Sequence, residues 1–468
     1  MKSDSLIKNF SYTFFSNGIS LVISSLVVFV IPKIIGVQQY SYWQLYTFFM
    51  MYVGILHFGW IDGIYLKFGG KSFELLDRDL FQKEFLGILL LQLVEFIIVL
   101  VYADLHYMPS YRKEVFSGVA FGLVFTNLRM FFQYILQITT KVKEYAVVVS
   151  IDRICYLLFV VLVIVFGGKN FYLLMVCDLV ARALSMCLSF YFCKSLIVHK
   201  IETSRLFLKN IWNDISVGYK LLIANFASTL IIGVIRYGIQ DHFGITKFGR
   251  VSLMLSISSF IMTFISAVSL VLFPYLRRIA VNKMDTTFIN IREIVTFLLI
   301  SMQLLYYPLM LILPYWLPQY SQSFKYMTIL FPMTVFDGKF EILSNTMMKT
   351  LRLEKNLLYF NIFSLFFSLL GTYILVVLDA KLIYFVYLIL VSLALRSILS
   401  VVFVSKKLKV NSLADIVVEL VMVAIFIVSN WVESSLLIQL VIFGIAYLIF
   451  ATLSGRKIRK IYLNIKNK

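Results

Sequence analysis

The residues of this sequence that can do chemistry are a few charged side chains that interrupt long apolar stretches. Five basic residues in this setting are candidate ligands for an anionic group: Arg129, Arg182, Arg236, Lys339 and Arg396. A charged side chain near the centre of a bilayer costs roughly 2.5–3.5 kcal/mol on insertion scales, so it needs a partner, a wet cavity or a role. The planar guanidinium of arginine donates two hydrogen bonds to a phosphate and stays charged when desolvated. We therefore expect these residues to bind a phosphate or pyrophosphate group in a cavity.

Four acidic residues in the apolar stretches are candidates for a gate or an ion-coupling site: Asp62, Asp178, Asp337 and Glu341. Asp62 is expected at an inner gate. Asp178 precedes Arg182 by four residues, so these two can also neutralise each other on one helix face. Three arginines have no acidic residue within one turn of their own helix and would have to pair across helices: Arg129, Arg236 and Arg396. The functional and the structural interpretation of these charges both stay open.

Asp337, Lys339 and Glu341 lie together in one apolar stretch. In an uninterrupted helix Asp337 and Glu341 share a face, whereas Lys339 points about 200° away from Asp337. The three side chains can face one direction only if the helix is broken. The Asp337-Gly338 step is a candidate for such a break.

Motifs for catalysis and for metal binding are missing from the sequence. The four histidines are scattered, and there is no HExxH, no GxSxG and no Walker-type glycine loop. The four cysteines lack the CxxC spacing of a zinc site. We therefore expect a protein that is not an enzyme, with no catalytic residue, no metal and no cofactor.

The long apolar stretches predict an all-α polytopic membrane protein with about fourteen transmembrane helices. Hydrophobic residues form 61% of the 468 residues, charged residues form 14%, and the mean hydropathy is +0.90. Soluble chains hold roughly 45–50% apolar and about 25% charged residues, and a helix must be about 20 residues long to cross a bilayer. The predicted spans are residues 11–32, 41–66, 85–103, 115–138, 146–166, 171–192, 217–239, 250–274, 294–313, 326–347, 357–378, 382–404, 414–431 and 435–453.

The positive charge of the chain predicts its topology. Lys and Arg total 43 against 24 Asp and Glu, which gives a formal net charge of +19. If the N-terminus is cytoplasmic, most of the basic residues outside the spans fall in segments on the cytoplasmic side, as the positive-inside rule requires. We therefore expect both termini in the cytoplasm. The basic excess is then a topology signal, and no nucleic-acid partner is expected.

An internal repeat predicts two similar halves. An asparagine, a glycine and an aromatic residue recur at an offset of 208 residues: Asn17 with Asn225, Gly36 with Gly244, and Tyr40 with Phe248. The same offset maps six predicted spans onto six others, and both halves begin on the same side, so the repeat is parallel. The expected domains are a six-helix bundle at 1–198, an amphipathic interfacial linker at 199–216, a second six-helix bundle at 217–410, and two extra helices with a basic tail at 411–468.

The first 70 residues resemble the start of a known family. The stretch His57–Gly70 has the sequence HFGWIDGIYLKFGG, and PKIIG (32–36) and YSYWQLY (40–46) precede it. With the span count and the repeat, these segments are similar to bacterial polysaccharide repeat-unit flippases. These are the Wzx-type exporters of the multidrug/oligosaccharidyl-lipid/polysaccharide transporter superfamily, which also includes multidrug extruders and lipid-linked peptidoglycan precursor flippases.

The resemblance implies alternating-access transfer of an undecaprenyl-pyrophosphate-linked oligosaccharide to the outer leaflet of the bacterial cytoplasmic membrane, for surface polysaccharide biosynthesis. It implies membrane lipids, a polysaccharide polymerase and glycosyltransferases as partners. Two alternatives stay open: a cation-coupled multidrug or metabolite antiporter, and a membrane-embedded polysaccharide polymerase. The first is disfavoured because no Asp or Glu occurs between Asp4 and Asp62, where drug extruders of the superfamily commonly carry one. A peptidoglycan precursor is disfavoured as substrate because the first two spans hold no arginine.

Overall fold

The computed structural model describes residues 3–139, 141–198, 207–276, 279, 283–432 and 435–466, and its regular structure is helical throughout these ranges. The predicted class, an all-α polytopic membrane protein, is confirmed. Packing divides the chain into two compact units, unit 1 (Met1–Phe226) and unit 2 (Ala227–Lys468). The division falls inside helix α7 (Phe207–Phe243).

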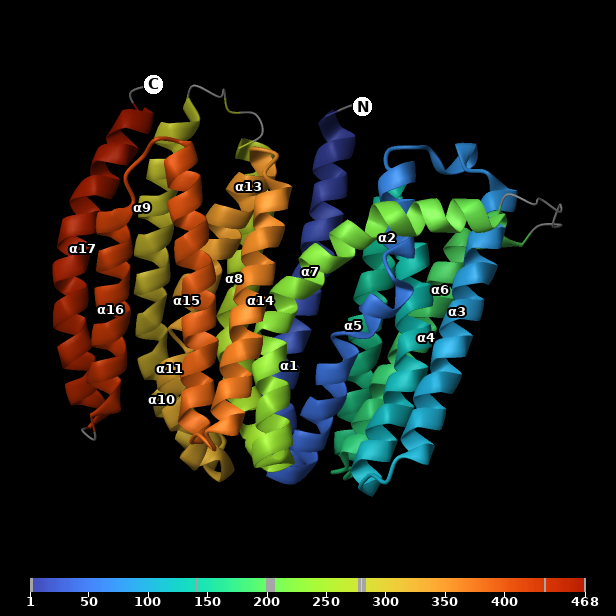
Figure 1. Ribbon diagram of the computed structural model, residues 1–468, viewed down its shortest axis with the longest axis horizontal. Helices are drawn as coiled ribbons and strands as arrows, with labels where there is room; N and C mark the ends of the chain where they lie inside the picture. Colours follow the sequence, from blue (N-terminus) through green and yellow to red (C-terminus); the bar gives the residue numbers. More distant parts are fainter. Residues whose placement is uncertain are drawn as a thin grey trace. The chain divides into compact units, whose positions relative to one another are not determined.

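Unit 1 is a helical bundle in which α3, α4 and α6 run side by side (Figure 1). Its core is rich in phenylalanine, with Phe81, Phe131 and Phe132 almost fully buried. Asp77 caps α3 by accepting hydrogen bonds from the backbone N–H groups of Asp79 and Leu80. The elements of unit 1 before α7 are α1 (Ser3–Met50), η1 (Val53–His57), α2 (Trp60–Phe68), η2 (Phe73–Leu75), α3 (Arg78–Leu105), α4 (Ser110–Ile138), α5 (Val142–Val165) and α6 (Phe171–Ile197).

Two glycines of the predicted repeat adopt the same unusual backbone conformation. Gly36 has a φ of 75° and kinks α1, and Gly244 has a φ of 81° between α7 and α8 (Ile245–Leu276). Glycine reaches this left-handed region without the steric cost that a side chain would bring. The glycine at each of these positions therefore marks the junction of two helices.

The second predicted span, residues 41–66, is broken in the structure. The chain passes from α1 through η1 to α2, and the helices on the two sides of the break are bent by 61°. Phe58 (φ 52°) and Gly59 (φ 84°) form the turn before α2. A broken membrane helix frees backbone carbonyl and N–H groups, so other groups must satisfy them.

The first part of α7 crosses α2 at backbone contact. A Cβ atom at Gly63 would lie 1.9 Å from the carbonyl oxygen of Asp214, and one at Gly218 would lie 1.9 Å from the carbonyl oxygen of Gly59. Lys67 donates to Asp214 at 2.9 Å. Figure 1 shows this part of α7 running across unit 1 at a steep angle to α3 and α4. Of the predicted linker, residues 199–206 lie outside the described residues and 207–216 belong to α7.

We expect Gly63→Ala to destabilise unit 1 because the added methyl group has no space beside the α7 backbone. Overpacking of this kind costs about 1–3 kcal/mol. The unfolding temperature of the purified full-length protein in detergent should therefore fall. Gly455→Ala is the matched control, since a Cβ atom at this helical position meets nothing within 4 Å. An unchanged unfolding temperature for Gly63→Ala would contradict the close crossing.

Unit 2 contains the second part of α7 and the helices that follow it. A buried cluster that includes Phe288, Phe340 and Met347 forms part of its core. After α8 its elements are α9 (Met284–Met302), η4 (Gln303–Leu305), α10 (Tyr306–Trp316), η5 (Pro318–Ser323), α11 (Phe324–Leu330), α12 (Met333–Lys339), the π-helix η6 (Phe340–Asn345), α13 (Thr346–Thr350), α14 (Glu354–Val377), α15 (Leu382–Lys407), α16 (Leu413–Trp431) and α17 (Leu436–Lys466).

Eleven spans in the described part of the chain are long and apolar enough to cross a membrane, or twelve with the bent pair at residues 27–68. Of the two remaining predicted spans, residues 11–32 are helical and residues 326–347 are divided into short elements. Residues 11–32 lie in the first part of α1, where few side chains are described. Residues 326–347 form the short elements from α11 to α13, because Pro332 cannot continue the hydrogen bonding of α11 and η6 widens the helix.

Candidate functional site

Charged residues of α4, α5 and α6 form one group in unit 1, which we call the arginine network: Arg129, Asp152, Arg153, Asp178 and Arg182. Arg129 Nη1 lies 2.5 Å from Asp152 Oδ1, and Arg182 Nε lies 2.6 Å from Asp178 Oδ2. Arg153 Nε is 3.6 Å from the other oxygen of Asp152. The two close pairs also act on each other electrostatically. Three arginines face two aspartates, so the network carries one positive charge in excess.

The arginine network is held in place by α1 and α4. Tyr46 donates a hydrogen bond of 2.7 Å to Asp178, and Arg182 donates one of 3.1 Å to Thr126. The side chains of Asp152 and Asp178 are each 9% exposed, whereas that of Arg153 is 38% exposed. Arg153 is therefore the most accessible cation of the network.

The structure resolves how three predicted site residues of unit 1 are arranged. Asp178 and Arg182 form the pair that their spacing of four residues predicts. Arg129 pairs with Asp152 of the neighbouring helix α5, which is the cross-helix arrangement that the sequence left open. Arg153 was not among the predicted ligands. The sequence feature that could have identified Arg153 is its position next to Asp152, because one carboxylate cannot neutralise both Arg129 and Arg153.

Two predicted cations of unit 2, Arg396 and Lys339, form ion pairs across helices around η6. Arg396 of α15 forms an ion pair with Asp337 of α12, donates a hydrogen bond of 2.6 Å to Ser228 and lies 4.0 Å from the ring centroid of Phe340. Glu341 accepts a hydrogen bond of 3.0 Å from Asn345. Arg396 is therefore enclosed by protein groups, and its role as a substrate ligand stays a prediction.

Lys339 points away from Asp337 and forms an ion pair with Glu419 of α16. The two side chains are only 1% and 3% exposed. The Asp337-Gly338 step, the predicted break, lies inside α12, and the change of helix type comes after Lys339, where α12 gives way to η6. The charges around η6 are the cations Lys339 and Arg396 and the carboxylates Asp337, Glu341 and Glu419. This group therefore has more negative than positive charges, whereas the arginine network has more positive than negative charges.

The remaining predicted residues, Arg236 and Asp62, lie outside these two groups. Arg236 of α7 donates a hydrogen bond of 2.9 Å to Ser252, and its guanidinium lies 5.2 Å from the ring centroid of Phe248. Asp62 of α2 is buried 3.8 Å from His57 at the break in the second span. Binding and gating roles for these residues stay predictions.

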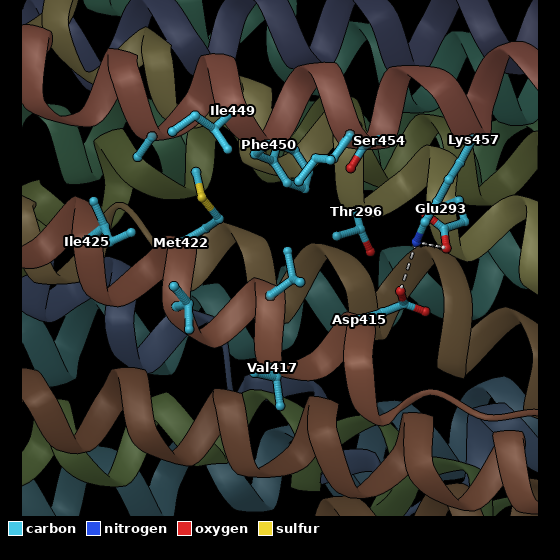
Figure 2. Close-up of a pocket in the computed structure, with 14 residues that line it drawn as sticks. Glu293, Thr296, Asp415, Val417, Met422, Ile425, Ile449, Phe450, Ser454 and Lys457 are labelled. Atoms are coloured by element: carbon cyan, nitrogen blue, oxygen red, sulfur yellow. Dashed lines mark hydrogen bonds and ion pairs between the residues drawn. The ribbon is translucent and has the colours of Figure 1, made fainter.

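A groove in unit 2 lies between α9, α16 and α17 and has a volume of about 540 Å³ (Figure 2). Ile425, Met422 and Ile449 line its apolar part. At the other end Lys457 lies 3.0 Å from Glu293 and 3.5 Å from Asp415. The volume of this groove is in the range of about 300–1,000 Å³ that ligand pockets occupy. An apolar groove with a charged end suits an amphiphilic molecule.

The fold is similar to that of solved membrane transporters. One is the lipid II flippase MurJ in an inward closed conformation, which has a TM-score of 0.65 and 16% identity over 96% of this chain and 99% of its own. Another is an inward-facing multidrug resistance transporter of the MATE family, within the MOP superfamily, which has a TM-score of 0.60 and 13% identity over 84% of this chain and 98% of its own. No protein-family model and no curated protein matches the sequence. The chain therefore has the fold of MOP-superfamily transporters.

Proposed function

We propose that this chain is a flippase that moves polyprenyl-pyrophosphate-linked oligosaccharide repeat units from the inner to the outer leaflet of the bacterial cytoplasmic membrane. The observation that carries the proposal is the excess positive charge of the arginine network within predicted membrane spans. An unneutralised cation within a membrane span is costly, and a pyrophosphate would remove that cost by accepting charge-assisted hydrogen bonds. Arg153, as the accessible cation, is the residue that we expect to meet the pyrophosphate first.

The fold and the groove support a lipid-linked substrate. A lipid II flippase shares the fold over nearly the whole chain. The apolar side of the groove in unit 2, with Val421, Ile425 and Ile449, is a surface that an apolar lipid chain would fit. Transfer by alternating access would use the two units as the moving bodies, and glycosyltransferases and a polymerase would supply the substrate and consume the product.

The sidedness of lipid-linked oligosaccharide tests this proposal. In cells depleted of the protein, a membrane-impermeant sugar-modifying reagent applied to spheroplasts should leave repeat units unmodified, because they accumulate in the inner leaflet. Re-expression of the wild-type chain should restore their modification. Normal modification in depleted cells would refute the flippase. Raised drug sensitivity would then favour the antiporter, and altered glycan chain length with normal transfer would favour the polymerase.

A further inference from the structure

The inward face of α3 carries polar residues that the proposed function does not use. Only 17% of the most apolar window of α3 is buried, so most of this helix faces outward from unit 1. Its buried residues nevertheless include Glu84, Gln92 and Glu95. Polar groups at such positions are costly without partners, so their arrangement calls for a role.

Gln92 and Glu84 contact the segments before and after the break in the second span. Gln92 Oε1 accepts a hydrogen bond of 2.6 Å from the amide of Asn127, and the same amide donates one of 3.1 Å to the backbone carbonyl of Val53 in η1. Beyond the break, Glu84 accepts a hydrogen bond of 2.6 Å from the indole of Trp60 at the start of α2. Asn127 of α4 thus binds a backbone carbonyl beside the break, and the face of α3 holds this amide and the indole of Trp60 in place.

Glu95 lies one helical turn beyond Gln92, is 8% exposed and has no cation beside it in the described part of the chain. Gln92 is the polar group that interacts with it, but their atoms do not meet hydrogen-bond geometry. Both oxygens of Glu95 and Nε2 of Gln92 therefore remain unsatisfied. A buried carboxyl group without a cation is stable only in its neutral, protonated form.

The charged groups of the elements packed against α3 do not pair with Glu95 among the described residues. These elements are α4, α6 and η1. Their titratable charged groups are Arg112, Lys113, Glu114, Arg129, Asp178, Arg182, Lys194 and His57. Arg129, Asp178 and Arg182 belong to the arginine network, and His57 lies against Asp62. Nothing on these elements supplies the positive charge that an ionised Glu95 would need.

We infer that Glu95 is a proton-binding site that controls the break in the second span. In the structure described, Glu95 holds its proton and the chain from Gln92 through Asn127 to the Val53 carbonyl stabilises the break. When Glu95 releases its proton to water, the carboxylate attracts Nε2 of Gln92 and draws this side chain away from Asn127. Asn127 then loses the acceptor that orients its amide, its hydrogen bond to the Val53 carbonyl weakens, and the break opens or straightens.

Infrared spectroscopy of the purified full-length protein in nanodiscs tests the proton directly. At neutral pH the wild-type protein should show the carbonyl band of a protonated carboxylic acid, and Glu95→Gln should reduce that band. Glu74→Gln, at an exposed carboxylate before α3, is the matched control and should leave the band unchanged. An identical band in wild type and Glu95→Gln overturns the inference.

Hydrogen exchange of residues 51–60, corrected for the intrinsic effect of pH, tests the coupling without any transport substrate. Opening of this segment should increase with pH in the wild type, by up to about tenfold per pH unit if one proton is released. Glu95→Gln should remove this increase, and Glu95→Asp should retain it. An increase that persists in Glu95→Gln would assign the response to His57 or Asp62, and a response to sodium instead of to pH would overturn proton binding. Because neither readout uses lipid-linked oligosaccharide, failure of the flippase proposal would not affect them.

Discussion

Arg153→Gln should slow the transfer of lipid-linked oligosaccharide by about tenfold or more, while the amount of protein in the membrane stays that of the wild type. The substitution removes the one positive charge in excess and leaves the pairs Arg129–Asp152 and Arg182–Asp178 in place. A hydrogen bond to a charged group contributes about 1.5–3 kcal/mol, and 1.4 kcal/mol is a factor of ten in a rate or an affinity. The measurement is the rate at which repeat units become accessible to the impermeant reagent, with membrane abundance followed in parallel.

Two further variants separate charge from structure at this position. Arg153→Lys keeps the positive charge but not the planar guanidinium, so we expect it to retain part of the transfer rate. Arg78→Gln, at an exposed arginine of the same unit outside the arginine network, should leave the rate unchanged. If Arg153→Gln transfers at the wild-type rate, the arginine network is not the anion site. If it lowers abundance instead, Arg153 has a structural role.

Lys339→Met should destabilise unit 2 by about 3–5 kcal/mol, the cost of leaving one member of a buried ion pair without its partner. Glu419, 3% exposed, would then be buried without the cation that balances its charge. Lys339→Met combined with Glu419→Leu should recover most of the stability, because well-packed apolar residues replace a buried pair at little cost. Thermal unfolding of the three proteins in detergent measures this directly. A double variant no more stable than Lys339→Met would show that the pair itself is not the cause.

The contrast between Arg153 and Lys339 bears on where an anionic headgroup binds. Lys339 and Arg396 belong to a group with more carboxylates than cations, and their side chains are 1% and 3% exposed. Arg153 belongs to a group with more cations than carboxylates and is 38% exposed. Electrostatic attraction and access therefore both favour unit 1 for a pyrophosphate. The two predictions above separate a cation that binds substrate from one that stabilises the fold.

Local features of the sequence determined the class of the protein and some of its details. Apolar stretches of helical length predict membrane helices because hydropathy is a sum over neighbouring residues. The left-handed turns at Gly36 and Gly244 follow from a property of single glycines. The pair of Asp178 with Arg182 follows from the helical period, which places residues four apart on one face.

Only the tertiary structure decided which charges remain for function. Arg129 with Asp152, Asp337 with Arg396, and Lys339 with Glu419 join residues on different helices, so no spacing along the chain identifies the partners. The same applies to the contact of Gly63 with the α7 backbone and to the link from Gln92 through Asn127 to Val53. A helix face can be predicted from its own period, but the helix that packs against it depends on the packing of the whole unit. The excess positive charge at Arg153 can be recognised only after the other ion pairs of the arginine network have been assigned.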